Sequence, residues 1–383
     1  MTALELDRIT HRYPGTERPA LSEVSVAVPA GRMLAVVGPS GSGKSTLLRA
    51  AAGLVRPTSG AVHLAGRDVT DLPVERRDVT VMFQEPTLFD HLDVAGNVAF
   101  APRLAGARRR EARRLARRYL DLVRLPGLQD RPVSALSGGQ AQRVALARAL
   151  AAERSVLLLD EPFSALDSEL RRAMHDLVGE VRAALDPTLV LVTHDLDEAA
   201  LADRVLVVID GVAHQHAPAA AVYTRPASLA VARMLGGFTE VPGIVRRGIH
   251  HSDWGRMPVD LFGEGPAVLL LRREDLRLTS QATPGTVGIT ARVTHRRVRG
   301  RRVVATLRAP AGTTIEVELP LGRDVRVGQE TVVQAGPGPA WALPATAAET
   351  VPAPGPDPDP AAETPGAVFT ERSADPRGPV AQR

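Results

Sequence analysis

The chain has 383 residues, a hydrophobic content of 44% and a formal net charge of +4. Its length is enough for about two domains, and its small net charge argues against a nucleic-acid partner. It contains no cysteine, which excludes disulfides, cysteine-ligated zinc and thiol catalysis.

The N-terminal residues lack the basic-then-apolar pattern of a secretion signal. No apolar run approaches the ~18–20 residues that are needed to span a bilayer. We therefore expect a cytoplasmic protein, and any membrane process that it serves would need a separate spanning partner.

Up to about residue 235, short apolar runs alternate with helical patterns. Continuous apolar runs are typical of strands that are covered on both faces, and they occur at Met33–Gly38, Ser155–Asp160, Leu189–His194 and Arg204–Asp210. The helical segments between them are Ser45–Ala52, Glu111–Arg124, Gly138–Ala152 and Ser168–Leu185. This alternation predicts an α/β domain over residues 1–235 with a largely parallel sheet.

The stretch GPSGSGKST connects the first of these strands to the first of these helices. It matches the phosphate-binding pattern G-x-x-x-x-G-K-[ST], in which glycines let backbone N–H groups close around phosphate oxygens. It also holds Lys44, the only lysine of the chain. We expect Lys44 to reach the β- and γ-phosphates of ATP and Ser45 to ligate Mg²⁺. The predicted nucleotide-binding residues of the loop are Gly38, Pro39, Ser40, Gly41, Ser42, Gly43, Lys44, Ser45 and Thr46.

Two further strand ends carry candidate catalytic residues. In the stretch LLLDEP, Asp160 can hold the Mg²⁺ shell and Glu161 can polarise an attacking water. His194 ends another predicted strand and can hydrogen-bond both the γ-phosphate and the water. A lone histidine is more often structural, so His194 gains its interpretation only from the other residues.

The sequence LSGGQ stands directly before a predicted helix and comprises Leu136, Ser137, Gly138, Gly139 and Gln140. Ser137 can cap the helix, and the two glycines expose backbone N–H groups, which gives a second anion-binding helix terminus. An ordinary helix cap is the alternative interpretation. Because one nucleotide does not need two such termini on one chain, we expect this terminus to serve the nucleotide of another subunit.

Together, these motifs resemble the ATP-binding subunit of an ABC transporter over about residues 4–235. The resemblance implies a P-loop cassette, with a RecA-like core and a helical subdomain, that hydrolyses ATP with Mg²⁺. It adds Tyr13 for adenine stacking, Gln84 as a Mg²⁺ ligand and γ-phosphate sensor, and Asp167 in the D-loop Ser164–Asp167. It also implies that a second copy of the chain pairs with the first and that the two sandwich two ATP molecules.

The stretch DEPFSALD is similar to the importer branch of that family. The resemblance implies transmembrane permease subunits as partners, an extracytoplasmic solute-binding protein as an indirect partner, and a place on the cytoplasmic face of the membrane. The implied cargo is ferric iron, a polyamine, sulfate or molybdate, or a quaternary amine. Gly96 departs from the family, which commonly has glutamate there, in a segment that usually faces the permease.

Beyond about Val241 the pattern changes to the period-2 alternation of strands, as at Ile315–Leu319. Residues 241–343 are predicted to form a small all-β domain, which resembles the oligonucleotide-binding-type barrel of the TOBE module. Arg273 stands where that module usually has the proline of an Arg-Pro-Glu sequence. Residues 346–383 are rich in proline and poor in large apolar residues, which predicts a disordered tail.

Two other functions stay open at this point. A nucleic-acid-linked ATPase of the same superfamily is opposed by the small net charge and by a supply of only three tyrosines and two tryptophans to stack bases. A purely regulatory ATP-binding protein is opposed by the presence of both Glu161 and His194. We therefore predict an active ATPase without a nucleic-acid partner.

Overall fold

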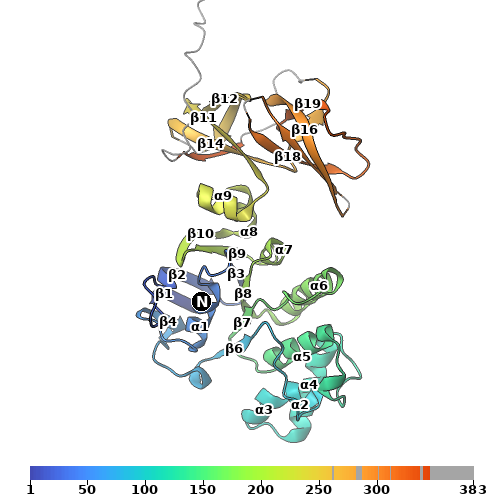
Figure 1. Ribbon diagram of the computed structural model, residues 1–383. Helices are drawn as coiled ribbons and strands as arrows, with labels where there is room; N and C mark the ends of the chain where they lie inside the picture. Colours follow the sequence, from blue (N-terminus) through green and yellow to red (C-terminus); the bar gives the residue numbers. More distant parts are fainter. Residues whose placement is uncertain (261–262, 282–286, 301, 311, 337–339, 346–383) are drawn as a thin grey trace, which may run out of the picture.

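The computed structural model describes residues 1–260, 263–281, 287–300, 302–310, 312–336 and 340–345. These residues form an N-terminal α/β part and a C-terminal all-β part, which lie one above the other in Figure 1. Helix α9 (Leu229–Leu235) lies between the two parts. We name residues 1–235 the cassette and residues 238–345 the β domain.

Two sheets form the centre of the cassette. The first is antiparallel, has the order β2-β1-β4-β5, and consists of β1 (Thr2–His11), β2 (Leu21–Pro29), β4 (Ser59–Leu64) and β5 (Arg67–Asp68). The second has the order β10-β9-β3-β8-β7-β6, and its strands pair in parallel except for β9 with β10. Its strands are β3 (Met33–Val37), β6 (Val79–Met82), β7 (Val156–Asp160), β8 (Thr188–Thr193), β9 (Arg204–Ile209) and β10 (Val212–Pro218).

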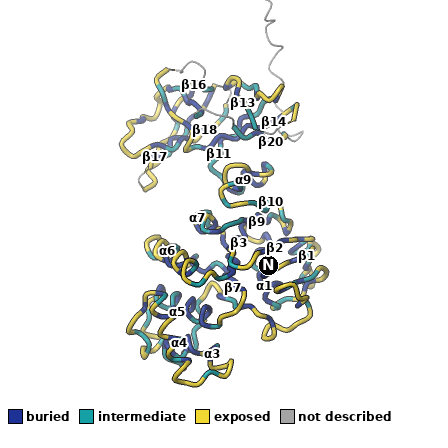
Figure 2. The backbone as a smooth tube through the Cα atoms, turned by 180° about the vertical axis from the view of Figure 1, so that it is seen from behind, coloured by how far each residue is buried: buried dark blue, intermediate teal, exposed yellow. Residues whose placement is uncertain are grey.

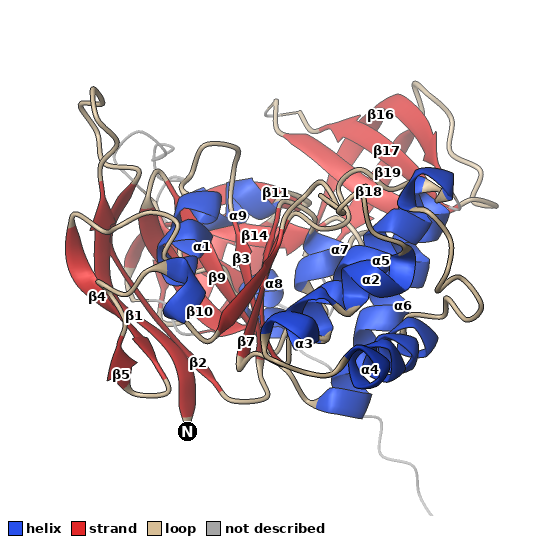
Figure 3. Cartoon of the chain, turned by 90° about the horizontal axis from the view of Figure 1, so that it is seen from below, coloured by secondary structure: helices blue, strands red, loops and turns tan. Residues whose placement is uncertain are grey.

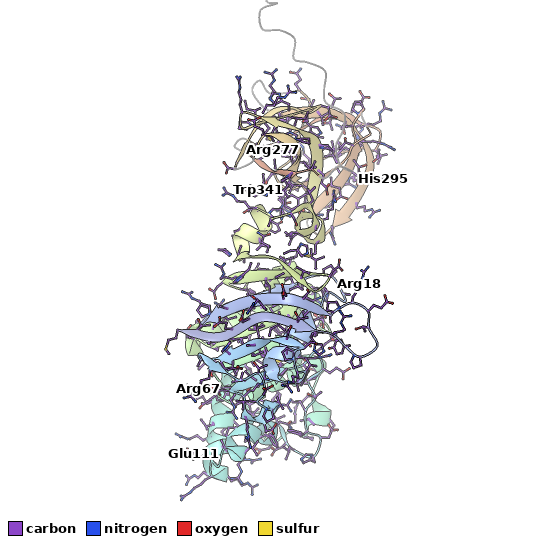
Figure 4. All side chains as sticks on the ribbon, turned by 90° about the vertical axis from the view of Figure 1, so that its left-hand side faces the viewer. Arg18, Arg67, Glu111, Arg277, His295 and Trp341 are labelled. Atoms are coloured by element: carbon purple, nitrogen blue, oxygen red, sulfur yellow. The ribbon has the colours of Figure 1, made fainter. Side chains whose placement is uncertain are left out.

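The helices of the cassette divide into two groups. Helix α1 (Lys44–Ala52) packs beside the strands, whereas α2 to α6 gather on one side of the sheets as a helical lobe (Figure 3). The lobe consists of α2 (Val94–Val98), α3 (Phe100–Leu104), α4 (Arg109–Leu122), α5 (Gly138–Leu150) and α6 (Ser168–Leu185). Glu111 of α4 lies at the end of the molecule opposite the β domain (Figure 4). The short helices α7 (Leu196–Ala199) and α8 (Ala219–Thr224) follow β8 and β10.

The parallel sheet is buried on both faces, as its continuous apolar runs predict. All residues of β3, β7 and β8 are buried (Figure 2). One apolar cluster fills the space between this sheet and the helical lobe, and another fills the space between the two sheets. Because the carboxyl ends of parallel strands meet at one edge, the loops that follow β3, β7 and β8 come together there.

The β domain contains a closed barrel and a second sheet. The barrel comprises β11 (Phe238–Arg246), β12 (Ile249–Ser252), β13 (Gly255–Asp260), β14 (Gly265–Arg272) and β20 (Ala340–Pro344). The sheet has the order β15-β19-β16-β17-β18 and comprises β15 (Arg277–Thr279), β16 (Gly288–Arg299), β17 (Arg302–Arg308), β18 (Thr314–Pro320) and β19 (Glu330–Gln334). A single apolar cluster, which includes Leu269 and Val317, runs through both. The sequence predicted one barrel, and the structure adds the second sheet to it.

A buried arginine joins the β domain to the cassette. The guanidinium carbon of Arg272, at the end of β14, lies 3.5 Å from the ring centroid of Tyr223 and 3.7 Å from that of Phe238. Its Nη1 donates to the carbonyl of Gly236 at 3.0 Å, and its Nη2 donates to the carbonyl of Tyr223. On the same seam, Trp341 donates from Nε1 to the carbonyl of Pro226 at 2.8 Å, and Figure 4 shows Trp341 on the side of the β domain near the cassette.

Arg273, the residue that departs from the TOBE pattern, also belongs to this seam. Its backbone N–H donates to the carbonyl of Gly237 at 3.0 Å. Its Nε lies 3.3 Å from Oε2 of Glu318 in the second sheet. A proline at this position could not donate that backbone hydrogen bond, so the departure changes how the turn is fastened.

The predicted fold class is confirmed: a mixed α/β cassette precedes a β domain that contains a small closed barrel. The predicted tail at 346–383 lies outside the described residues. Among the helices that the structure describes, none combines the length and the apolar character needed to cross a membrane.

Candidate nucleotide site

The phosphate loop lies between β3 and α1, in the strand–loop–helix setting that its sequence predicts. Gly43 directly precedes the helix with φ +99°, and a Cβ atom there would lie 2.3 Å from the carbonyl oxygen of Ala20. A Cβ atom on Gly38 would lie 2.0 Å from the carbonyl oxygen of Val208. Both positions therefore accept only glycine. The loop is thus held against β9 on one side and the start of β2 on the other.

Lys44 is buried at the start of α1, with 5% of its surface exposed. Its Nζ donates hydrogen bonds to the carbonyls of Gly38 at 2.9 Å and Pro39 at 2.8 Å. Burial lowers the pKa of Lys44, and the nearby carboxylates of Glu161 and Asp160 oppose that shift. A compact ammonium group with three donors can exchange these carbonyls for phosphate oxygens without a change of backbone.

Asp160 and Ser45 form an oxygen pair beside the loop. The hydroxyl of Ser45 donates to Oδ1 of Asp160 at 2.9 Å, and Asp160 is 8% exposed. Burial raises the pKa of Asp160, while the hydrogen bond from Ser45 acts in the opposite direction. Carboxylate and hydroxyl oxygens are the donors that Mg²⁺ prefers. The residues present therefore fit a Mg²⁺ ion.

Glu161 and His194 meet across neighbouring strands. Glu161 follows β7 with φ +45°, a conformation that costs energy in a residue other than glycine. Its N–H donates to the carbonyl of Val192 at 2.9 Å, which aligns it with the end of β8. Nδ1 of His194 lies 3.3 Å from Oε2 of Glu161. The side chain of Glu161 is 25% exposed and that of His194 is 60% exposed, so both reach the solvent edge where a nucleotide would bind.

Two predicted nucleotide contacts lie at the margin of this edge. The hydroxyl of Tyr13 lies 3.2 Å from that of Thr46, so the tyrosine stands beside the first turn of α1. Gln84 is exposed two residues beyond β6, which pairs with β7. The stacking role of Tyr13 and the sensing role of Gln84 stay predictions.

The LSGGQ motif belongs to the helical lobe, where it starts α5. Oγ of Ser137 accepts from the N–H of Gln140 at 3.3 Å, and Oε1 of Gln140 accepts from the N–H of Ser137 at 3.0 Å. This reciprocal capping box fixes the helix terminus and employs the Gln140 side chain within its own chain. Gly138 is exposed. No hydrogen bond or ion pair among the described residues links this motif to the phosphate loop, so the structure does not bring the two anion-binding termini together within one chain.

The D-loop connects β7 to α6. Oδ1 of Asp167 accepts from the N–H groups of Glu169 at 3.0 Å and Leu170 at 2.9 Å and so caps α6. Two buried or half-buried side chains hold this loop and were missed by the sequence interpretation. Gln142 of α5 donates to the carbonyl of Pro162, just before the D-loop, and Arg171 of α6 donates to the carbonyls of Phe163 and Leu166. Neither residue belongs to a recognisable motif. Gln142 lies 20 residues from its acceptor, and Arg171 reaches back across the turn that precedes α6.

The chain matches known proteins over most of its length. Residues 21–164 match the family described as ABC transporter, and residues 269–343 match the family described as TOBE domain. The chain is 41% identical over 333 residues to the Fe(3+) ions import ATP-binding protein FbpC of Streptomyces coelicolor, a match that covers 86% of this chain and 94% of that protein. It is 40% identical to the sulfate/thiosulfate import ATP-binding protein CysA 1 of Agrobacterium fabrum, over 82% of this chain and 92% of that protein.

A solved structure of a dimeric ATP-binding cassette in a post-hydrolysis state, bound to ADP and phosphate, aligns with a TM-score of 0.52 and 30% identity. The alignment covers 56% of this chain and 98% of that one. Given the phosphate loop, the Asp160–Glu161 pair, His194 and these matches over almost the full length of its relatives, the chain belongs to the ATP-binding subunits of ABC importers that carry a TOBE domain, and it is an ABC-type ATPase.

Proposed function

We propose that two copies of this chain close on two ATP molecules and thereby power an importer for a small ion or polar solute. The observation that carries this proposal is the separation of the two anion-binding termini. The phosphate loop of one copy would hold an ATP molecule from one side, and the exposed LSGGQ terminus of the other copy would hold it from the opposite side. The dimeric state of the similar cassette bound to ADP and phosphate supports this arrangement.

The hydrolytic chemistry follows from the geometry at the sheet edge. Lys44 binds the β- and γ-phosphates in place of its carbonyl partners. Ser45, Asp160 and Gln84 would hold a Mg²⁺ ion, which would supply positive charge to neutralise the phosphates. Glu161 orients the attacking water, and His194, 3.3 Å away, fixes the Glu161 carboxylate and the γ-phosphate. Removal of the γ-phosphate removes part of the dimer interface, so hydrolysis would reopen the pair.

A groove between β6 and the helical lobe is the proposed contact with a transmembrane permease subunit. It has a volume of about 470 Å³, and its lining includes the aromatic side chains of Phe83, Phe89 and Phe100. Phe83 and Phe100 are exposed at 39% and 41%, which is a large apolar surface to leave in water. Arg148 lies 5.3 Å from the ring of Phe89 at its side. Arg148 also donates to the carbonyls of Thr87 at 3.0 Å and Pro86 at 3.4 Å, which fixes this wall of the groove. The occupant that fits is a short amphipathic helix whose apolar residues cover the aromatic rings.

The position of this groove also suggests how the nucleotide site and the permease contact communicate. Phe83 lines the groove and is followed directly by Gln84, the proposed γ-phosphate sensor. A shift of Gln84 on ATP binding would therefore move the groove and the permease helix within it. Through the permease, the chain would sit at the cytoplasmic face of the membrane and receive the effect of an extracytoplasmic solute-binding protein. Relatives of near-equal identity are named for different cargoes, Fe(3+) and sulfate or thiosulfate, which supports placing cargo selection in those other subunits.

The substitution Glu161→Gln tests the proposal. It keeps the shape of the side chain but removes the carboxylate that orients water, so we expect ATP to stay bound and the dimer to persist. Sedimentation of the full chain with saturating MgATP measures this directly, and Glu5→Gln, an exposed glutamate on β1, is the matched control. A Glu161→Gln variant that stays monomeric and hydrolyses ATP at the normal rate would show the proposal to be wrong.

A further inference from the structure

Arg171, in the first turn of α6, hydrogen-bonds to the turn that contains the D-loop. Its Nη2 donates to the carbonyl of Leu166 at 2.9 Å, and its Nε donates to the carbonyl of Phe163 at 3.3 Å. Its side chain is 30% exposed, so these bonds are partly shielded from water. The two carbonyls stand on either side of the D-loop turn, and one planar guanidinium therefore sets the shape of that turn.

The same guanidinium also contacts the loop that carries His194. Nη1 of Arg171 lies 3.4 Å from Oδ2 of Asp195, the residue directly after His194. The other carboxylate oxygen of Asp195 caps α7, accepting from the N–H groups of Asp197 at 2.8 Å and Glu198 at 3.4 Å. Asp195 is therefore fixed to α7 through one oxygen and to α6 through the other.

A second contact supports this link between α6 and the His194 loop. Nε2 of His175, one turn further along α6, lies 3.9 Å from Oε1 of Glu198 on α7, and Glu198 is 2% exposed. The ring of His175 also packs against that of Phe163 with centroids 5.7 Å apart. Helix α6 thus packs against both loops, and Arg171 is the only side chain among the described residues that hydrogen-bonds to both.

We propose that Arg171 is a positioning residue that couples the two ATP sites of the dimer. In the sandwich proposed above, His194 faces the nucleotide of its own copy. The exposed D-loop residues Ala165 and Asp167 follow Glu161 at the same edge, where the partner copy would close. A shift of the His194 loop on ATP binding or hydrolysis is transmitted through Asp195 and Arg171 to the D-loop carbonyls, and so to the other site. The inference rests on the proposed dimer, and it assigns to Arg171 a role in the communication between sites rather than in nucleotide binding.

The test compares ATP hydrolysis by full chains that carry Arg171→Ala, Arg171→Lys or Asp195→Asn. Lysine keeps the charge but cannot reach three acceptors in the planar geometry of a guanidinium, so we expect it not to rescue. Asparagine keeps the cap of α7 but turns an amide rather than a carboxylate toward Arg171. We expect kcat to fall about ten- to a hundredfold in all three, with the KM for ATP changed less than about twofold and the Hill coefficient for ATP falling toward 1.

Arg172→Ala is the matched control, because Arg172 is the exposed neighbour on the same helix. It should keep the kcat and the cooperativity of the unchanged chain. The Arg171→Ala/Asp195→Asn double variant should lose no more activity than either single variant, since both break the same link. Additive losses, a rise in KM without a fall in kcat, or Arg171 variants that match Arg172→Ala would each overturn the inference.

The failure of this inference differs from the failure of the proposed function. If Glu161→Gln forms no ATP-dependent dimer, the sandwich itself is wrong. If that dimer forms and Arg171→Ala still hydrolyses ATP cooperatively at the normal rate, only the coupling role is wrong. Should Arg171→Ala fail to fold, Asp195→Asn provides the same test, because the Arg171 side chain then keeps its hydrogen bonds to the carbonyls of Phe163 and Leu166.

Discussion

Lys44 in the cassette and Arg272 in the β domain are both buried cations that donate to carbonyl oxygens, but their other neighbours differ. Lys44 donates to two carbonyls of a loop, and its neighbours include two carboxylates. Arg272 lies between two aromatic rings and donates to two carbonyls on the cassette side of the seam. Burial lowers the pKa of both groups.

The two cations differ in how easily their hydrogen-bond partners can be replaced by phosphate oxygens. A point-like ammonium that holds only carbonyl oxygens can turn to phosphate oxygens at little cost. A guanidinium clamped between rings gives up stacking and hydrogen bonds together if it moves, so it suits a permanent seam. Of the 47 lysine and arginine residues of this chain, all but one are arginine, and the single lysine stands at the exchangeable site.

The largest effect should follow from Lys44→Arg, which keeps the positive charge but replaces the ammonium group of the phosphate loop with a guanidinium group. The bulkier planar group cannot lie along the β- and γ-phosphates, so we expect ATP hydrolysis to fall about a hundredfold or more, with little change in thermal stability. Release of phosphate measures the rate. Arg49→Lys, the reverse exchange at an exposed position of the same helix, should leave the rate unchanged. Near-normal turnover in Lys44→Arg would refute the steric argument.

The next largest effect should follow from Arg272→Ala, which removes the clamp. The loss of ring stacking and of two hydrogen bonds from a charged donor should lower the free energy of unfolding by about 3 kcal/mol. The phosphate loop lies elsewhere, so the folded fraction should still hydrolyse ATP. Denaturant unfolding measures the loss, and Arg277→Ala, at an exposed position of β15, is the control. Equal stability of the two variants would mean that the seam does not depend on Arg272.

The smallest effect concerns another buried basic group, His250 in β12. It is fully buried, and burial lowers its pKa below the usual value of about 6.5. The unfolded chain therefore binds the proton more readily, so the stability of the β domain should be complete above about pH 7 and fall as the pH drops below about 6.5. Unfolding measured at several pH values tests this. His250→Phe should abolish the dependence and His251→Gln should keep it; the same slope in both would assign it to other groups.

The sequence predicted those parts of the site that lie within one contiguous segment. The phosphate loop was predictable because Met33–Val37, the glycines and the first turn of α1 follow one another, and each obeys a local rule. The sequence placed Glu161 and His194 at separate strand ends, but the pairing of β7 with β8, which brings them together, is known only from the structure. The roles of Gln142 and Arg171 could not be predicted, because helix residues of ordinary type gain them only when the D-loop folds back onto α5 and α6.

In the β domain, too, the sequence predicted local structure but not contacts between distant segments. The alternation at Ile315–Leu319 indicated strands, and β18 covers Thr314–Pro320. It did not indicate which strands pair, because alternation is identical in a barrel and in an open sheet. The division into a closed barrel and a second sheet is decided by long-range register, such as the pairing of β11 with β14 over Phe238–Val245.

The backbone N–H of Arg273, bonded to the carbonyl of Gly237, bears on exchange of domains between relatives. A β domain transplanted from a protein with proline at this position would leave that carbonyl without its donor, and would also lack the side chain that reaches Glu318. Transplants should therefore succeed best when the donor domain has a residue other than proline at this position. In this chain, the choice of a compatible β domain depends on a backbone N–H at the end of β14 as well as on the linker.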